Sequence, residues 1–511
     1  MRSALRSGSI AVFAMLATMT SAAQVVLPKL LSDHMVVQRD MPVHVWGVAE
    51  PGETVSVDFR GESRTVTTDR IGHWSAYLKP GAAGGPFEMK VQGGKANEPS
   101  ITIHDVLVGD VWVASGQSNM EMPLKGWPPD SPLQNSTEEI ANANQPLLRL
   151  LIVKQKTSEY PVDDIDATWM VCTPQTAGDF SAVAYFFGRE LAARERVPVG
   201  LIQSAWGGTP AEAWVRLTAL GEDAALNPLF ASRGRMVEDG ADTARQIADE
   251  QKQIAEAKAA GKPVPQFPWH ASLPSWGPGN LWNGMIAPLT PFPVRGAIWY
   301  QGESNASLER FPIYNRIMRA LIEDWRREWA VGDFPFLYVQ ISSFKADSHD
   351  EWASLRQQQV ETLGLKNTAM AVTIDIGTPD TVHPPDKVDV GRRLALAARA
   401  LSYGETLEYS GPLFRQVVPD NLAGAGAVRV WFDHAKGLNA KGGELTGVEV
   451  AGKDGKFVPA KAVIEGETIL ASSPDVPQPL AVRYGWAGNP QCNLFNGEGL
   501  PASPFTSIKD F

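Results

Sequence analysis

The chain has 511 residues, of which 44% are hydrophobic and 20% charged, so it can form roughly two to four domains with real cores. This composition excludes a disordered protein. The formal net charge of −11 and the lack of any basic run argue against a nucleic-acid partner.

The N-terminal stretch has the features of a secretory signal peptide. Arg2 and Arg6 give a positive start, Ile10–Met19 is apolar, and Ser21–Ala23 supplies small residues for cleavage before Gln24. The apolar run is too short to span a bilayer comfortably, and no later stretch is a transmembrane candidate. We therefore expect an exported protein, periplasmic or extracellular, that is not held in a membrane after cleavage.

The segment 24–105 is predicted to be all-β. Five short runs alternate apolar and polar residues, with turn signals between them. The runs are Val43–Trp46, Thr54–Asp58, Arg64–Thr67, Trp74–Leu78 and Phe87–Val91. Regular short strands of this kind suggest a small sandwich. Two roles are open for it, a sugar-binding module or a structural cap on the domain that follows, and we favour the cap.

From about residue 106 the pattern changes to strands that alternate with helices. The strand-like runs are Val106–Ala114, Val199–Ile202, Gly296–Trp299, Phe336–Ile341 and Met370–Ile376. Val183–Arg196 and Ile313–Trp329 have apolar residues near helical spacing. This alternation predicts the α/β class, with a parallel sheet that carries helices on both faces.

The alternation is interrupted between Thr209 and Gly296. Asp242–Ala260 is charged and alanine-rich, and we interpret it as a solvated surface helix. Beyond it, four aromatic residues lie among Pro and Gly, and rings in such a loop suit the faces of sugars. These residues are Trp269, His270, Trp276 and Trp282.

After His383 the chain is predicted to be helical, with Gly404 as the stop, and alternation typical of strands returns from about residue 411. We therefore expect a signal peptide at 1–23, a β domain at 24–105, an α/β domain at 106–410 with an insertion at about 211–290, and a β domain at 411–511.

Only two cysteines are present, Cys172 and Cys492. Export permits a disulfide, but two free thiols are favoured because nothing in the spacing supports pairing. No Cys/His cluster suggests a metal site, so we expect neither a metal nor another cofactor.

Four predicted strands are each followed by small or polar residues. These turns lie in Ser115–Asn119, Ala205–Pro210, Ala297–Asn305 and Asp380–His383. Ligands bind at the carboxyl ends of strands in open α/β sheets, so the four turns can converge on one site. Ser118 lies just past a buried strand, where a nucleophilic hydroxyl would be rigidly held and open. An ordinary strand-to-loop turn is the alternative for this stretch.

Taken together, these blocks resemble the bacterial sialate O-acetylesterases of the SGNH (GDSL-type) hydrolase superfamily. The matching blocks are Gly116–Met120, Trp206–Thr209, Trp299–Asn305 and His383–Lys387, and the tail Tyr484–Phe505 is also similar. The resemblance covers nearly the whole mature chain. It implies an SGNH-hydrolase-like parallel sheet flanked by helices, with β-sandwich-like domains at both ends. It also implies a serine carbohydrate esterase that removes O-acetyl groups from sugars.

A serine hydroxyl needs a base, and the base needs an orienting group. Of the eight histidines, His383 is the one at the end of a core-type strand with a carboxylate nearby. Asp380 lies three residues earlier, and short Asp-x-x-His spacing in one loop is the superfamily's pattern. The resemblance thus implies Ser118, His383 and Asp380 as the catalytic residues, with Asp375 as the second candidate for the carboxylate.

The resemblance also implies donors for an oxyanion. They are the Ser118 N–H, one glycine of the Gly207–Gly208 pair, with Gly208 preferred, and the Asn305 side-chain amide. The turn contains Gly116-Gln117-Ser118 instead of the superfamily's common Gly-Asp-Ser-like block, a departure that matches the sialate-esterase branch.

Five further residues are candidates for substrate contact or site support. They are Gln117, Gly207, Glu303, Trp206 and Trp282. Gln117 adds an amide or shapes the turn, and Glu303 is expected to bond loop backbone without a catalytic role.

Other functions stay open from the sequence. An acetylesterase for plant cell-wall polysaccharide, xylan or xyloglucan, fits the same blocks, since they specify the acyl chemistry but not the sugar. A non-catalytic carbohydrate-binding protein on the same fold is a further alternative. A peptidase or lipase with the same triad is disfavoured by the Trp-rich loops and the absence of a hydrophobic lid.

Overall fold

The computed structural model describes residues 24–95, 99–231, 233–265, 267, 277–346, 350–420 and 426–508. The predicted signal peptide and three of the four loop aromatics, Trp269, His270 and Trp276, lie outside the described residues. Within the described ranges, no helix combines the length and apolar character needed to cross a membrane.

The N-terminal part is built of short strands, as predicted. They are β1 (Val36–Gln38), β2 (Val43–Val48), β3 (Thr54–Phe59), β4 (Glu62–Thr67), β5 (His73–Leu78) and β6 (Gly84–Gly93). β2 pairs with β5, while β4, β3 and β6 pair in that order. All of these strands pair antiparallel except β1, which pairs in parallel with the long strand β7 (Ile101–Gly116). Buried and exposed residues alternate along β5, because one face covers the core and the other meets solvent.

A single long strand, β7 (Ile101–Gly116), joins this part to the sheet that follows. Its first half pairs with β6, and its second half pairs with β10 (Val199–Ala205) and β11 (Gly296–Tyr300). From Val106 onward every residue is buried, which suits a strand covered on both faces. The predicted domain boundary at residue 105 falls inside β7, so a continuous strand rather than a flexible linker connects the two parts.

The central sheet has the order β13-β12-β11-β7-β10-β8-β9. Its remaining strands are β8 (Gln145–Ile152), β9 (Trp169–Cys172), β12 (Phe336–Val339) and β13 (Thr368–Ala371). All neighbours are parallel except β8 and β9. The α/β prediction is confirmed, but a wholly parallel sheet is wrong at this edge, because a loop at 153–168 turns the chain back.

Two cores lie on the two faces of this sheet, and alternate residues of each strand enter different cores. On β11, Ile298 packs with α3 (Ala182–Glu195) and α9 (Val388–Tyr403). Trp299 packs on the other face with α7 (Tyr314–Trp329) and α8 (Trp352–Thr362). This alternation follows from the two-residue period of a strand. The core containing Trp299 continues into the N-terminal β part.

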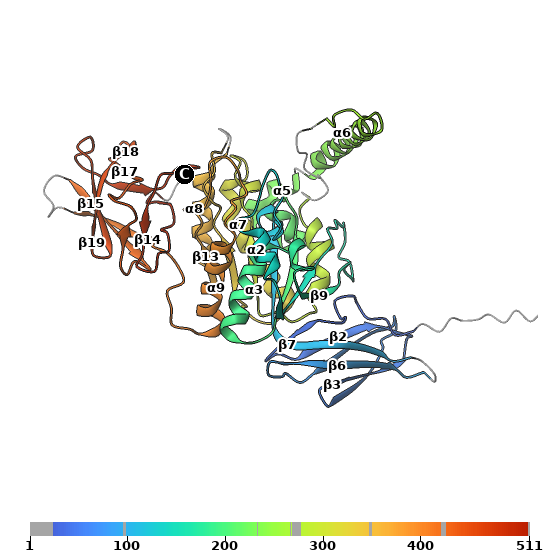
Figure 1. Cartoon of the computed structure of the whole chain (residues 1–511). Coiled ribbons are helices and arrows are strands. Elements are labelled where there is room, and N and C mark those ends of the chain that lie inside the picture. The colour runs from blue at the N-terminus through green and yellow to red at the C-terminus, as the bar shows by residue number, and fades with distance from the viewer. Residues whose placement is uncertain are drawn as a thin grey trace, which may run out of the picture.

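The other helices are short, with one exception. They are α1 (Ser118–Glu121), α2 (Ser136–Ala141), α4 (Leu217–Leu220), α5 (Asn227–Ala231) and α6 (Arg233–Ala259). Single helical turns occur at Ala177–Asp179, Ala211–Trp214, Ala224–Leu226, Trp282–Ile286, Ala287–Leu289, Glu303–Asn305 and Phe311–Ile313. The long helix α6 stands away from the central sheet (Figure 1). Its side chains from Asp242 onward are exposed or half-exposed, as expected for a surface helix.

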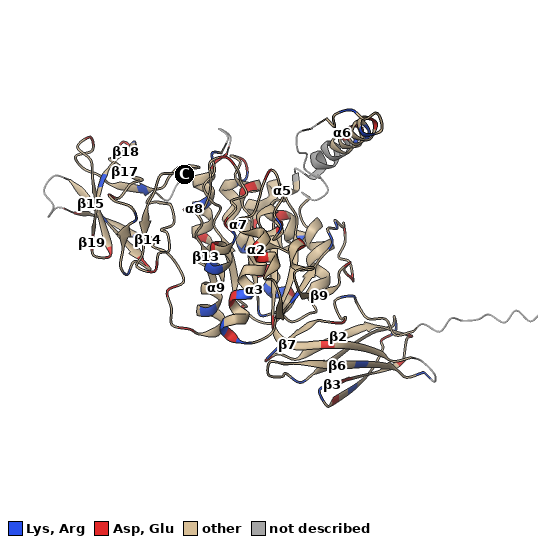
Figure 2. Ribbon diagram, in the orientation of Figure 1, with Lys and Arg blue, Asp and Glu red and all other residues tan. Residues whose placement is uncertain are grey.

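The C-terminal part is again made of strands and has its own core. Its strands are β14 (Leu413–Asp420), β15 (Ala427–Asp433), β16 (Asn439–Ala440), β17 (Val448–Ala451), β18 (Phe457–Pro459), β19 (Lys461–Glu465), β20 (Thr468–Ser472), β21 (Ala481–Tyr484), β22 (Leu494–Phe495) and β23 (Phe505–Thr506). The two β parts lie on different sides of the α/β part (Figure 1). Acidic and basic residues are interspersed in all three parts (Figure 2). Cys172 and Cys492 are both free.

A buried carboxylate connects the parts near the middle of β7. Asp110 has no exposed surface and accepts hydrogen bonds from Arg39 at 2.9 and 3.0 Å and from Gln38 at 3.2 Å, both in the N-terminal part. It also accepts from the hydroxyl of Tyr403, at the end of α9, at 2.9 Å. One side chain therefore fixes the β part, the central sheet and α9 relative to one another.

We predict that Asp110→Ala lowers the free energy of unfolding by about 3 kcal/mol, because it leaves the largely buried guanidinium of Arg39 and the hydroxyl of Tyr403 without their acceptor. Asp40→Ala is the matched control. Asp40 is 61% exposed and lies 3.8 Å from the same arginine, so its loss should cost under about 1 kcal/mol. Urea unfolding of the two variants checks this, and equal losses would contradict it.

Candidate active site

A cavity of about 630 Å³ lies where several strands end. β10, β7 and β11 are parallel neighbours, and Ala205, Gly116 and Tyr300 are paired at their carboxyl ends. The segments that follow these strands and the loop before α9 all contribute to the wall. The lining residues are Gln117, Ser118, Glu121, Trp127, Gln155, Trp206, Gly207, Gly208, Glu303, Ser304, Phe344, Asp350, Trp352, Val382 and His383. The predicted convergence of four loops is therefore present.

Ser118 is placed in this cavity by a turn that only glycine can make. Gly116 has φ +135°, and a Cβ there would lie 2.1 Å from the carbonyl oxygen of Tyr300. β7 can therefore approach β11 closely up to its last residue. Ser118 then begins α1 and is half-buried, and its backbone N–H makes no hydrogen bond to the described residues.

His383 reaches the serine from a loop 265 residues away in the sequence. Its Nε2 lies 2.9 Å from Ser118 Oγ. Its Nδ1 lies 3.4 Å from Ser131 Oγ, and its backbone N–H donates to Thr381 Oγ1 at 3.0 Å. Burial, together with the nearby charge of Lys387, lowers the pKa of His383 to about 4. The imidazole is thus neutral at pH 7 and able to accept a proton.

Neither candidate carboxylate lies against this imidazole. Asp380 is exposed and makes no hydrogen bond to the part of the chain that the structure describes. The carbonyl of the preceding Pro379 accepts from the Lys345 N–H at 3.2 Å, which holds this end of the loop at the surface. Asp375 is engaged elsewhere, because both of its oxygens accept from Arg393, at 2.6 and 2.7 Å.

The two glycines of the predicted oxyanion site differ in their hydrogen bonding. The Gly207 N–H donates to Glu121 Oε2 at 2.5 Å. The Gly208 N–H makes no hydrogen bond to the described residues, and Gly208 has φ +74°, a conformation that favours glycine. A Cβ on Gly207 would lie 3.3 Å from that of Ser118, so this backbone passes close to the serine. Of the pair, Gly208 is the one with a donor left for a ligand.

Asn305 does not line the cavity, which departs from its predicted role. Its Nδ2 donates to Glu212 Oε2 at 2.9 Å. Its Oδ1 accepts from the Ala211 N–H at 2.9 Å and from Gln301 Nε2 at 2.6 Å. The amide is fully buried and fixes the segment that follows the two glycines.

The supporting residues take different positions. Gln117 shapes the turn, because its Oε1 accepts from the N–H groups of Gly302 at 3.2 Å and Ser304 at 3.3 Å. Trp206 lines the cavity and is half-buried. Trp282 is 1% exposed, packs in a core and does not line this cavity.

Sequence reasoning gave no role to Asn119, which links the serine turn to the histidine loop. Its Nδ2 donates to Glu303 Oε1 at 2.7 Å and to the Val382 carbonyl at 2.9 Å. Its Oδ1 accepts from Lys387 Nζ at 2.5 Å. Lys387 is fully buried, and burial lowers its pKa to about 7 although the charge of Glu303 opposes the shift. Asn119 and Lys387 both lie in sequence blocks that resemble the esterase family. Their contact joins residues 268 positions apart, so no local sequence pattern could predict it.

Glu121 is a second residue that was missed. Besides the Gly207 N–H, its carboxylate accepts from Gln155 Nε2 at 2.8 Å. Burial raises the pKa of Glu121. Its place one helical turn after Ser118 is the only sequence signal that could have identified it.

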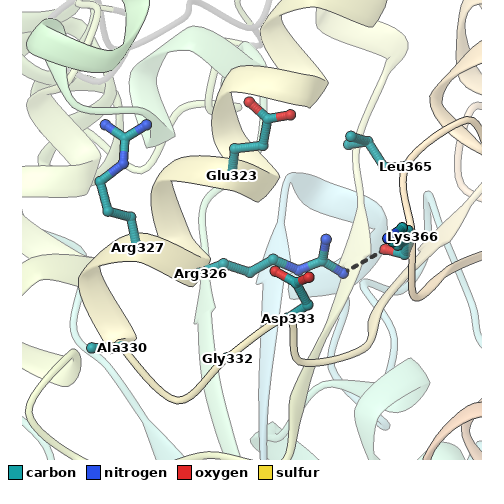
Figure 3. A pocket seen from close by; sticks show the side chains of 8 residues that line it. All are labelled: Glu323, Arg326, Arg327, Ala330, Gly332, Asp333, Leu365 and Lys366. Atoms are coloured by element: carbon teal, nitrogen blue, oxygen red, sulfur yellow. Dashed lines mark hydrogen bonds between the residues drawn. The ribbon is translucent and has the colours of Figure 1, made fainter.

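Another hollow, of about 530 Å³, lies at the end of α7 and lacks comparable chemistry (Figure 3). The guanidinium of Arg326 donates there to the carbonyls of Phe334 and Lys366, at 2.8 and 2.9 Å. This arginine holds backbone in place, and the described residues that line the hollow include no serine, cysteine or histidine. The cavity at Ser118 is therefore the better candidate for an active site.

With Asp380 at the surface, we expect the His383 imidazole to titrate near pH 4, which NMR of its ring protons would measure. Lys387→Met should raise this pKa, because Lys387 is protonated at that pH and its charge opposes the imidazolium. Lys436→Met, at an exposed site in the C-terminal part, should leave it unchanged. An unchanged titration in Lys387→Met would contradict the electrostatic coupling.

Comparisons with known proteins give a consistent result. A family model described as "Carbohydrate esterase, sialic acid-specific acetylesterase" matches residues 271–400. The chain is 33% identical to a sialate O-acetylesterase of Pongo abelii and 32% identical to that of Homo sapiens, over 94% of this chain and 91% of each relative. Its structure is similar to that of a carbohydrate acetylesterase from Xanthomonas citri, with a TM-score of 0.81 and 38% identity over 95% of this chain and 100% of that one.

Proposed function

Because the chain belongs to the sialate O-acetylesterase family, and is thus a carbohydrate esterase that acts on O-acetylated sugars, we propose that Ser118 and His383 carry its ester hydrolysis. The observation that supports this most is the 2.9 Å approach of His383 Nε2 to Ser118 Oγ inside a cavity. A neutral imidazole at that distance can act as a general base.

In the proposed reaction, Ser118 Oγ attacks the acetyl carbonyl carbon while its proton passes to His383 Nε2. The oxyanion of the tetrahedral intermediate accepts from the N–H groups of Ser118 and Gly208. The imidazolium then gives its proton to the sugar oxygen as the bond to the acyl carbon breaks. Water, deprotonated by His383, then attacks the acetyl-serine, and the imidazolium returns the proton to Ser118 Oγ as its bond to the acyl carbon breaks and acetate leaves.

Asp380 remains in the proposal as the orienting carboxylate. To reach Nδ1, the loop that precedes His383 must turn inward, away from its contact with Lys345. An opposite charge beside the imidazole would raise its pKa and make it a better base. Asn305 is proposed as a support for the Gly207–Gly208 segment rather than as a donor, since its amide is already engaged.

The proposal extends to the finer classification and to the location of the protein. It assigns an SGNH-type hydrolase of the bacterial sialate-esterase kind, with β domains at 24–105 and 411–511. It also includes export after removal of residues 1–23. The sequence blocks and the charge and apolar pattern of the first residues support these assignments.

A neutral acetylated sugar, as in plant cell-wall polysaccharide, is a second candidate substrate. The carboxyl groups of Glu121, Glu303 and Asp350 line the cavity, and among the described residues no lysine or arginine does. A sugar carboxylate would lose hydration there without gaining a cation. If the protein carboxyls are ionised, repulsion adds to this cost.

Acetate release can distinguish an anionic sialic acid from a neutral sugar as the substrate. Purified protein should release acetate from an aryl acetate and from O-acetyl sugars, with or without a chelator, because no step of the proposed reaction uses a metal ion. The methyl ester of an O-acetyl sialic acid should be cleaved about tenfold faster than the free acid, a difference of about 1.4 kcal/mol. Equal rates would favour the sialate substrate, and no acetate from any compound would favour a binding protein.

We expect Ser118→Ala and His383→Ala each to lower kcat by several orders of magnitude, and the double variant to cost little more, because the two residues act as one unit. Asp380→Asn should cost less, since the base remains. Circular dichroism and thermal melting would confirm folding. A folded Ser118→Ala protein with more than about a tenth of the activity would exclude a covalent serine, as under about 1.4 kcal/mol would be at stake.

A further inference from the structure

The loop at 153–168 borders three cavities in succession. Gln155 lines both the cavity at Ser118 and a second one of about 410 Å³. Asp164 lines this second cavity and also a third one of about 640 Å³. Because each shared residue borders two neighbouring cavities, the three follow one another along the surface. They lead from Ser118 to the N-terminal β part.

Backbone contacts hold this loop in place. The N–H groups of Ser158 and Val162 donate to the carbonyls of Asn280 at 3.1 Å and Asn283 at 3.0 Å. Asn283 Nδ2 returns a bond to the Ser158 carbonyl at 3.1 Å. The wall between the cavities is therefore a fixed feature of the fold.

The middle cavity is polar and carries charges of both signs. Three lysines and two aspartates contribute to its lining, namely Lys29, Lys154, Lys156, Asp164 and Asp166. Lys29 and Lys154 both contact Asp166, at 3.2 and 3.3 Å. Closely spaced donors and acceptors of this kind suit the hydroxyl groups of a sugar.

The third cavity is mainly apolar and aromatic. It lies between the β2–β5 pair and the segment 282–291. Trp46 is half-buried in its wall, and the ring of His44 stacks on it with centroids 4.9 Å apart. Ser75 and Asp163 add polar groups. Apolar walls with a few polar groups are typical of ligand sites, and aromatic rings present flat apolar faces to the C–H faces of sugars.

We propose that the substrate is an O-acetylated oligosaccharide chain that occupies all three cavities. The acetylated sugar lies at Ser118, the next sugars follow the loop at Gln155 and Asp164, and the far end stacks on Trp46. A single sugar bound at Ser118 would occupy only the first cavity and would leave the aromatic one without a role. This inference rests on the proposed function of Ser118, and it gives the β part a share in substrate binding.

The first test compares singly acetylated neutral oligosaccharides from a disaccharide to a hexasaccharide. We expect kcat/KM to rise about tenfold or more with length, mainly through KM, because added sugars bind away from the reacting bond. No rise would overturn the inference. Hydrolysis of an aryl acetate distinguishes the proposed function of Ser118 from the proposed binding of an oligosaccharide. If it fails in the wild type, the proposed function fails, whereas hydrolysis without a length effect removes only the oligosaccharide path.

The second test uses variants of the aromatic end. Trp46→Ala should abolish the rise of kcat/KM with oligosaccharide length. Trp431, on β15 in the C-terminal part, is 41% exposed, and the control Trp431→Ala should retain this rise. If Trp46→Ala does not fold, Val26→Arg fills the same cavity from a side chain that is 55% exposed. A folded variant of either kind that keeps the full rise would overturn the inference.

Binding of unacetylated oligosaccharides to an inactive variant tests the path directly. Ser118→Ala should bind the unacetylated hexasaccharide more tightly than the disaccharide in calorimetry, and adding Trp46→Ala should remove this difference. Equal affinities for the two sugars in Ser118→Ala would contradict an extended path.

Discussion

The structure depends on β7, a single strand that belongs to two sheets. Ladder hydrogen bonds tie its first half to β6 and its second half to β10 and β11. Its end is defined by Gly116, where any side chain would collide with the Tyr300 carbonyl. The position of Ser118 therefore follows from backbone pairing, and the β part and the nucleophile are held on one rigid element.

The residues around the nucleophile are arranged by a buried polar group rather than by the predicted carboxylate. Asn119 connects the turn of Ser118 to Val382, and Glu303 and Lys387 hold its two ends. Buried charges of this kind contribute little to stability, so their value lies in geometry. Their electrostatic effect is unfavourable for a base, because Lys387 adds to the burial that depresses the pKa of His383. A general base works best with a pKa near the working pH. The proposed inward movement of Asp380 would raise the pKa of His383 towards that value.

The family defines the acyl chemistry, while the surroundings of the site bear on the sugar. A serine, a base and backbone donors can deacetylate any accessible ester, so they carry no information about the ring that bears it. That information lies in the carboxyl-lined cavity and in the wall that leads towards Trp46. The β part is attached without a flexible linker, so its aromatic surface keeps a constant position relative to Ser118.

The sequence by itself determined the α/β class of the fold and most of its elements, because strand and helix periodicity and strand-end turns are local features. The strand-end turns also indicated one shared site, whereas the roles of Ser118, His383 and Gly208 in it were implied by the resemblance to the esterase family. β8 and β9 were missed, although the mostly apolar run Leu147–Val153 is a local signal for β8. Only the tertiary structure decided that Asn305 is engaged with Glu212, that Trp282 belongs to a core, and that Asp380 points outward. It alone brought Lys387 to Asn119, because contacts between side chains far apart in sequence arise only when the chain is packed.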